Sequence, residues 1–90
     1  MEKSYVKVFE RHGYYRVNIR LEKGETLVFD FGKIKYSVQY NGYVERYLLT
    51  KRLNKRIVSS VVRDLSVKYL KKQKPKHLER MLEEALNKVE

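Results

Sequence analysis

Cysteine is absent from this 90-residue chain, which contains one proline and no tryptophan. Without cysteine, neither a disulfide framework nor a thiolate metal site is available. No apolar run approaches the roughly 20 residues of a transmembrane helix, and no signal-peptide core is recognisable. These absences predict a single cytoplasmic domain over residues 1–90. The lack of cysteine, the single proline and 36% charged residues also fit an organism from a hot environment.

Acidic residues are scarce in one segment of a chain whose net charge is +10. Residues 51–77 contain ten Lys or Arg and one acidic residue, a net charge of +9. Residues 1–50 have a net charge of +3, and residues 78–90 have a net charge of −2. An evenly spread excess would favour only solubility, whereas a concentrated one indicates an anionic partner.

Alternating apolar residues in the first half predict five antiparallel strands separated by four turns. The turn signals are His12-Gly13, Lys23-Gly24-Glu25, Gly32-Lys33 and Asn41-Gly42. Because a turn fixes the register of its hairpin, each signal predicts a cross-strand pairing. The pairs expected at the four turns are Val8 with Val17, Leu21 with Leu27, Phe31 with Ile34, and Tyr40 with Tyr43.

This register places apolar side chains on one face of the sheet. The predicted core face contains Val6, Val8, Tyr15, Val17, Ile19, Leu21, Leu27, Phe29, Phe31, Ile34, Tyr36, Val38 and Tyr40. Glu45 does not fit, because it falls opposite Val38 on that face. Its position suggests either a β-bulge or the end of the core.

The second half predicts two helices. Residues 51–70 have apolar positions at helical spacing, including Val58, Val62 and Leu65, and a second apolar stripe spans residues 75–89. The expected fold class is therefore α+β: a five-stranded antiparallel β-meander followed by two C-terminal α-helices. The first helix should pack on the apolar face of the sheet.

The other face of the first two strands combines aromatic and basic residues. Its members are Tyr5, Lys7, Phe9, Arg11, Tyr14, Arg16, Asn18 and Arg20. Nucleobases stack on aromatic rings and Lys or Arg neutralises phosphates, so this pattern is typical of a sheet that binds single-stranded RNA or DNA. The alternatives are an ordinary solvated exterior or a face covered by a helix.

The first helix predicts a second anionic contact. On a helical wheel its polar sector contains Arg52, Arg56, Ser59, Arg63 and Ser66, with Lys55 at the edge and Lys71, Lys72, Lys74 and Lys76 following. Arginine and hydroxyl side chains on one stripe suit phosphate contacts. A solvated helix face is the alternative, although such a face usually alternates Glu with Lys.

The second helix has an acidic exterior and a long apolar stripe. The stripe consists of Leu78, Met81, Leu82, Ala85, Leu86 and Val89. It packs either beside the first helix or against a second copy of the chain, which would make a homodimer and strengthen binding through effective concentration.

Motifs for catalysis are not recognisable. The glycines are spaced as turns, the two histidines lie far apart, and no base accompanies Ser59 or Ser60. Asp30 and Glu45 would suit a two-carboxylate metal site, but the predicted register points them to opposite faces. We therefore expect neither an enzyme nor a metal, cofactor or small-molecule substrate.

The sequence predicts a non-catalytic nucleic-acid-binding protein whose partner is DNA or RNA. The predicted binding residues are Lys7, Phe9, Arg11, Tyr14, Arg16, Arg20, Arg52, Lys55, Arg56, Arg63, Lys71, Lys72, Lys74 and Lys76. The alternative is a protein-interaction module, a subunit or an inhibitor, that docks an acidic partner through residues 51–76.

Overall fold

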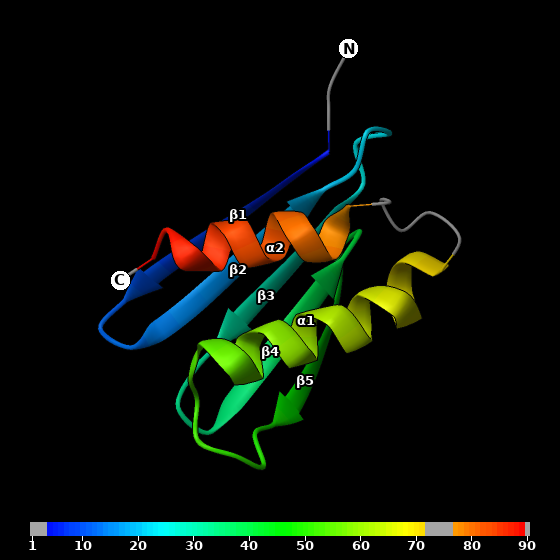
Figure 1. The fold of residues 1–90 in the computed structure, drawn as a ribbon. Coiled ribbons are helices and arrows are strands. Elements are labelled where there is room, and N and C mark those ends of the chain that lie inside the picture. The colour runs from blue at the N-terminus through cyan, green and yellow to red at the C-terminus, as the bar shows by residue number, and fades with distance from the viewer. Residues whose placement is uncertain (1–3, 72–76, 90) are drawn as a thin grey trace.

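The computed structural model describes residues 4–71 and 77–89 (Figure 1). The elements are β1 (Tyr5–Arg11), β2 (Tyr14–Arg20), β3 (Thr26–Phe31), β4 (Lys35–Tyr40), β5 (Tyr43–Leu48), α1 (Lys55–Leu70) and α2 (Leu78–Asn87). The strands form one antiparallel sheet in chain order. This arrangement confirms the predicted α+β class, with a five-stranded meander and two helices after it.

Both helices lie on the same face of the sheet and run in opposite directions (Figure 1). α2 packs against β1 and against α1, while α1 lies over β4 and β5. The Lys55 ammonium, at the start of α1, donates a hydrogen bond to the carbonyl oxygen of Val89, just beyond α2. Among the described residues, no helix covers the other face, which we call the open face.

The hydrophobic core fills the space between the sheet and the helices. Its most completely buried side chains come from all the layers: Val17, Ile19, Leu27, Phe29 and Val38 from the strands, Val58, Val62 and Leu70 from α1, and Leu78 and Leu82 from α2. Because strand side chains alternate between faces, burying this set sends the intervening residues to the open face.

The first and fourth turns confirm the predicted pairing. His12 and Gly13 have φ angles of 54° and 82°, and Asn41 and Gly42 have φ angles of 48° and 90°. Two successive residues in the left-handed region define the type I′ turn of a two-residue hairpin. Val8 therefore pairs with Val17, as expected.

The second turn begins one residue earlier than predicted. The Leu21 amide donates to the Glu25 carbonyl at 2.9 Å, which leaves residues 22–24 as the loop. Gly24 is the last loop residue, with a φ of 92°, and its amide donates to the Leu21 carbonyl. The predicted pairing of Leu21 with Leu27 is therefore wrong, because glycine is needed at the third loop position and not at the second.

The third turn lies one residue later than predicted. The Gly32 amide donates to the Lys35 carbonyl at 2.8 Å, so Lys33 and Ile34 form the loop. Ile34 is 71% exposed, and its predicted place in the core is wrong. Phe31 pairs with Tyr36 instead.

An aromatic stack accounts for this register. The Phe31 and Tyr36 ring centroids lie 5.3 Å apart, and the stack continues to Phe29 on one side and Tyr47 on the other. Stacked aromatic pairs add to the stabilisation from buried area. The predicted register would have placed Ile34 rather than Tyr36 beside Phe31, and the continuous stack would be lost.

Glu45 marks the end of the core without a bulge. It lies opposite Val38, and the pairing of β4 with β5 is unbroken around it. The Tyr69 and Tyr47 hydroxyls both donate hydrogen bonds to its carboxylate. A carboxylate is thus accommodated on the helix side of the sheet because two tyrosines satisfy it there.

This cluster predicts a loss of stability at alkaline pH. Burial, together with donation to Glu45, raises the pKa of Tyr69 above its ordinary value. A raised pKa in the folded state gives stability that is present below the unfolded-state pKa, about 10, and declines above it. We expect the free energy of unfolding to fall above pH 10, and to fall less steeply in Tyr69→Phe. Urea denaturation at a series of pH values around and above 10 measures this free energy. Tyr43→Phe, which changes an exposed tyrosine, is the control. Equal slopes for all three proteins would contradict the assignment.

Helix α1 begins later than expected and presents a different face to the sheet. The Asn54 side chain accepts a hydrogen bond from the Ile57 amide at 2.9 Å, so Asn54 is the N-cap and the predicted start at residue 51 is wrong. The buried positions are Val58, Val62, Ser66 and Leu70. Ser66 therefore lies in the core and not in the exposed basic sector.

Burial of Ser66 predicts a stabilising substitution. Its hydroxyl is fully buried and has no hydrogen-bond partner among the described residues. Ser66→Ala should raise the free energy of unfolding by about 1–2 kcal/mol, because it removes an unpaired polar group and improves helix propensity. Ser60→Ala on the same helix should give only the propensity gain, about 0.5 kcal/mol. Equal effects in urea denaturation would contradict the burial argument.

The apolar stripe of α2 packs on its own chain. Leu78, Leu82 and Leu86 are buried, while Met81 and Ala85 remain half-buried. This is the first of the two arrangements that the sequence left open. The homodimer remains a prediction.

Candidate nucleic-acid interface

The open face presents its side chains in rows that cross the sheet. Strand pairing aligns Phe9 with Arg16, Arg16 with Asp30, Asp30 with Ser37, and Ser37 with Arg46. We call these five residues the central row. The neighbouring row, toward the His12-Gly13 end of β1 and β2, consists of Arg11, Tyr14, Gly32, Lys35 and Leu48.

Positive charge dominates the open face. Six cations of the described strands lie there: Lys7, Arg11, Arg16, Arg20, Lys35 and Arg46. Asp30 is the carboxylate that accompanies them on these strands. Such an excess on one surface attracts polyanions over a distance of about one Debye length, roughly 8–10 Å.

Three aromatic rings lie among these cations on β1 and β2. Tyr5, Phe9 and Tyr14 are 37%, 52% and 48% exposed. The Lys7 ammonium lies 4.9 Å from the centre of the Tyr5 ring. The structure thus brings the predicted aromatic and basic residues of the first two strands together on one uncovered surface.

Arg16 is held by an ion pair on this face. Its Nε donates to Asp30 Oδ1 at 2.6 Å, and both side chains are substantially exposed. An exposed pair adds little to stability. Its effect is positional, because it fixes the guanidinium and the carboxylate side by side in the central row.

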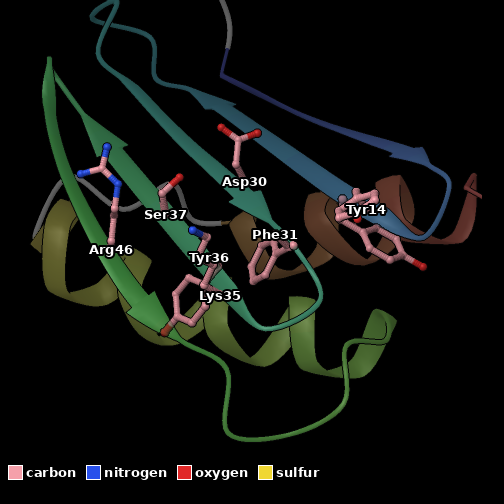
Figure 2. Close-up of a pocket in the computed structure, with 9 residues that line it drawn as sticks. Tyr14, Asp30, Phe31, Lys35, Tyr36, Ser37 and Arg46 are labelled. Atoms are coloured by element: carbon pink, nitrogen blue, oxygen red, sulfur yellow. The ribbon is translucent and has the colours of Figure 1, made fainter.

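A pocket of about 370 Å³ lies between the two rows (Figure 2). Its open-face lining consists of Tyr14, Asp30, Gly32, Lys35, Ser37 and Arg46. Figure 2 shows Asp30, Ser37 and Arg46 pointing to one side of the sheet and the rings of Phe31 and Tyr36 pointing to the other. The pocket therefore combines an aromatic ring, two cations, a carboxylate and a hydroxyl.

The predicted helix residues lie apart from this surface. Arg56 and Arg63 are exposed on α1, which lies on the opposite side of the sheet from the open face. Arg52 is exposed in the segment before α1. The two predicted surfaces are therefore on opposite sides of the protein, and a short ligand contacts only one of them.

The remaining predicted lysines occupy varied positions. Lys55 is half-buried and bonded to Val89, which directs its ammonium toward the end of α2. Lys71 is exposed at the end of α1. Lys72, Lys74 and Lys76 lie outside the described residues.

Sequence reasoning missed the β3–β5 side of the interface. Lys35, Ser37 and Arg46 lie on this face but were not among the predicted binding residues. The signal was available, because Arg46 alternates with the core-facing Glu45 and Tyr47. Gly32 was interpreted only as a turn residue.

Within residues 4–71 and 77–89, no group of three or more His, Asp or Glu side chains is placed to hold a metal ion. Asp30 and Glu45 lie on opposite faces, as the sequence predicted. No helix in the same part of the chain is long and apolar enough to cross a membrane.

Comparison with known proteins finds no matching family model, no similar curated protein and no similar solved structure. The functional inference therefore rests on the chemistry of the two surfaces.

Proposed function

We propose that this protein is a non-catalytic nucleic-acid-binding protein whose open face holds single-stranded RNA or DNA. The observation that supports the proposal is the set of three exposed aromatic rings interleaved with cations on the uncovered face. Each base stacked on such a ring contributes about 1–3 kcal/mol, and the neighbouring cations release counterions from the phosphates.

The spacing of the rings favours a single strand over a duplex. Phe9 lies opposite Arg16, so Tyr14 is its diagonal neighbour across β1 and β2. Diagonal neighbours in an antiparallel pair are about 7–8 Å apart. Successive bases of an extended strand reach two such rings, whereas the bases of a duplex are stacked on each other and present only their edges.

The basic surface of α1 supplies a second, weaker contact in this proposal. Arg56 and Arg63 attract phosphates without stacking, so they do not distinguish single from double strands. A longer strand that passes around the protein contacts both surfaces. We also propose a cytoplasmic location, because the chain has no cysteine for the disulfides that secreted small domains use.

Fluorescence anisotropy tests the strand preference. Single- and double-stranded DNA and RNA probes of equal length are titrated at about 50, 150 and 300 mM salt. We expect the single strands to bind more tightly than the duplexes, with affinity falling steeply as salt rises.

A matched pair of double variants separates the two surfaces. Lys7→Ala with Arg11→Ala should lower the salt slope by about one or two units, because two phosphate contacts are lost from the open face. Arg56→Ala with Arg63→Ala removes the same charge from α1 and should change single-strand affinity less. No binding to any probe at the lowest salt would overturn the proposal and leave the protein-docking alternative. A duplex preference abolished by the α1 variant would overturn the assignment to the open face.

A further inference from the structure

Gly32 lies in the row that borders the pocket and has no side chain there. Its φ lies outside the left-handed region, so the backbone conformation does not require glycine there. A Cβ at this position would lie 3.3 Å from the Lys35 carbonyl oxygen, a tight contact with backbone, and 3.9 Å from the Tyr14 ring. Glycine within or beside a strand often marks a close approach by another backbone segment or by a ligand, and the Lys35 carbonyl makes such an approach here. Gly32 and Tyr14 also line the same pocket, so a side chain at position 32 would crowd the aromatic wall of that pocket.

The walls of the pocket are chemically suited to a nucleobase. The Tyr14 ring provides an aromatic surface at the β2 side, and Arg46 lies at the β5 side (Figure 2). Asp30 and Ser37 lie between them in the central row. Lys35, beside Gly32, adds a second cation for a phosphate. A volume near 370 Å³ falls within the range of small-molecule sites.

We propose that this pocket binds one unpaired base of the strand and that the Asp30 carboxylate selects guanine. This inference rests on the proposed function, because it assigns a preferred base to the same open face. An ionised carboxylate only accepts hydrogen bonds. The Watson–Crick edge of guanine presents an imino N–H and an amino group side by side, which match such an acceptor.

The other bases match the Asp30 carboxylate less well. Adenine and cytosine each present one amino group beside an acceptor nitrogen, and thymine and uracil present carbonyl oxygens that the carboxylate repels. Arg16 occupies Asp30 Oδ1, and a carboxylate has about four lone-pair positions, so further donors are accommodated. The guanine edge is available only in a single strand, because base pairing covers it in a duplex.

A pair of oligonucleotides tests the selection. The probes are an all-thymidine single-stranded DNA and the same strand with one central guanine, titrated by anisotropy at one salt concentration. We expect the wild-type protein to bind the guanine probe about fivefold or more tightly, which is the low end for a bidentate base contact.

Substitution of the carboxylate identifies its role. Asp30→Asn should bring the ratio of the two affinities close to one while thymidine binding remains, because the amide presents a donor beside its acceptor. Asp64→Asn is the matched control, since Asp64 is an exposed carboxylate on α1. It makes the same charge change on the helix side and should leave the ratio unchanged.

Crowding the pocket lining provides an independent test. The methyl group of Gly32→Ala would press on the Lys35 carbonyl beside the Tyr14 ring and should lower the ratio toward one without removing any polar group. Ile34→Ala in the same hairpin should not alter the ratio. Circular dichroism and urea denaturation establish that each variant is folded.

Three outcomes would overturn the inference. Equal binding of the two probes by the wild type, or a guanine preference that survives both Asp30→Asn and Gly32→Ala, would overturn the base assignment alone. If neither probe binds, the proposed function fails and the base assignment fails with it.

Discussion

Joint replacement of Phe9 and Tyr14 by alanine is expected to weaken single-strand binding by about 30-fold or more. Each ring stacks one base in the proposed complex, at roughly 1–3 kcal/mol per base, and the two losses add where the bases stack independently. Both rings are about half exposed, so their removal leaves the core intact. Anisotropy with a single-stranded probe gives the loss directly, and urea denaturation should show little change in stability.

Two other exposed apolar residues provide the control for this variant. Ile34 and Tyr43 are 71% and 80% exposed in the third and fourth turn regions. Ile34→Ala with Tyr43→Ala removes a comparable amount of exposed apolar surface away from the aromatic group and should leave affinity unchanged. If the two double variants weakened binding equally, the loss would reflect general surface hydrophobicity and not stacking on Phe9 and Tyr14.

Phe29→Ala is expected to lower the free energy of unfolding by about 3–5 kcal/mol. Its ring is fully buried, stacks toward Phe31 and lies between Val17 and Val38 in the sheet. Removing it loses buried apolar surface and leaves a cavity that the neighbouring side chains fill only in part. A 90-residue domain is stable by only about 5–13 kcal/mol, so the variant should unfold at a much lower urea concentration.

Ile34→Ala distinguishes the observed register from the one expected from turn signals alone. In the observed register Ile34 is exposed in the loop, so the change should alter stability by less than about 0.5 kcal/mol. In the other register Ile34 packs beside Phe31, and the loss would be about 2–5 kcal/mol. A large loss in urea denaturation would therefore contradict the third turn as described.

The pattern of alternation was enough to predict both faces of the sheet, but not every pairing within it. Each of the two misplaced turns shifts its partner strand by two residues, and a two-residue shift leaves each side chain on the same face. The residue types at the turns did not show that Gly24 is the last residue of the second loop. They also did not show that Gly32 lies before the third loop. Those positions depend on the hydrogen bonds that close each loop and on the stack of Phe31 with Tyr36.

The position of the helices was less accessible to sequence reasoning. The 3.6-residue period identified α1, but the helical wheel placed Ser66 in the polar sector. With α2 beside it, α1 instead buries the line from Val58 to Leu70, which includes Ser66. The periodicity of one segment does not show that both helices lie on the same side of the sheet. It therefore does not show that the other face is left open. The pocket at Gly32 was missed for the same reason, because its lining comes from four strands.

The chain-order arrangement of the strands has a consequence for how the protein folds. Every strand pairs with its neighbour in sequence, through loops of only two or three residues for the four hairpins. Closing a short loop costs little conformational entropy, and local contacts are associated with rapid folding. The sheet is therefore assembled from successive hairpins. Docking of α2 on β1, which joins segments about 70 residues apart, is the long-range step that completes the core.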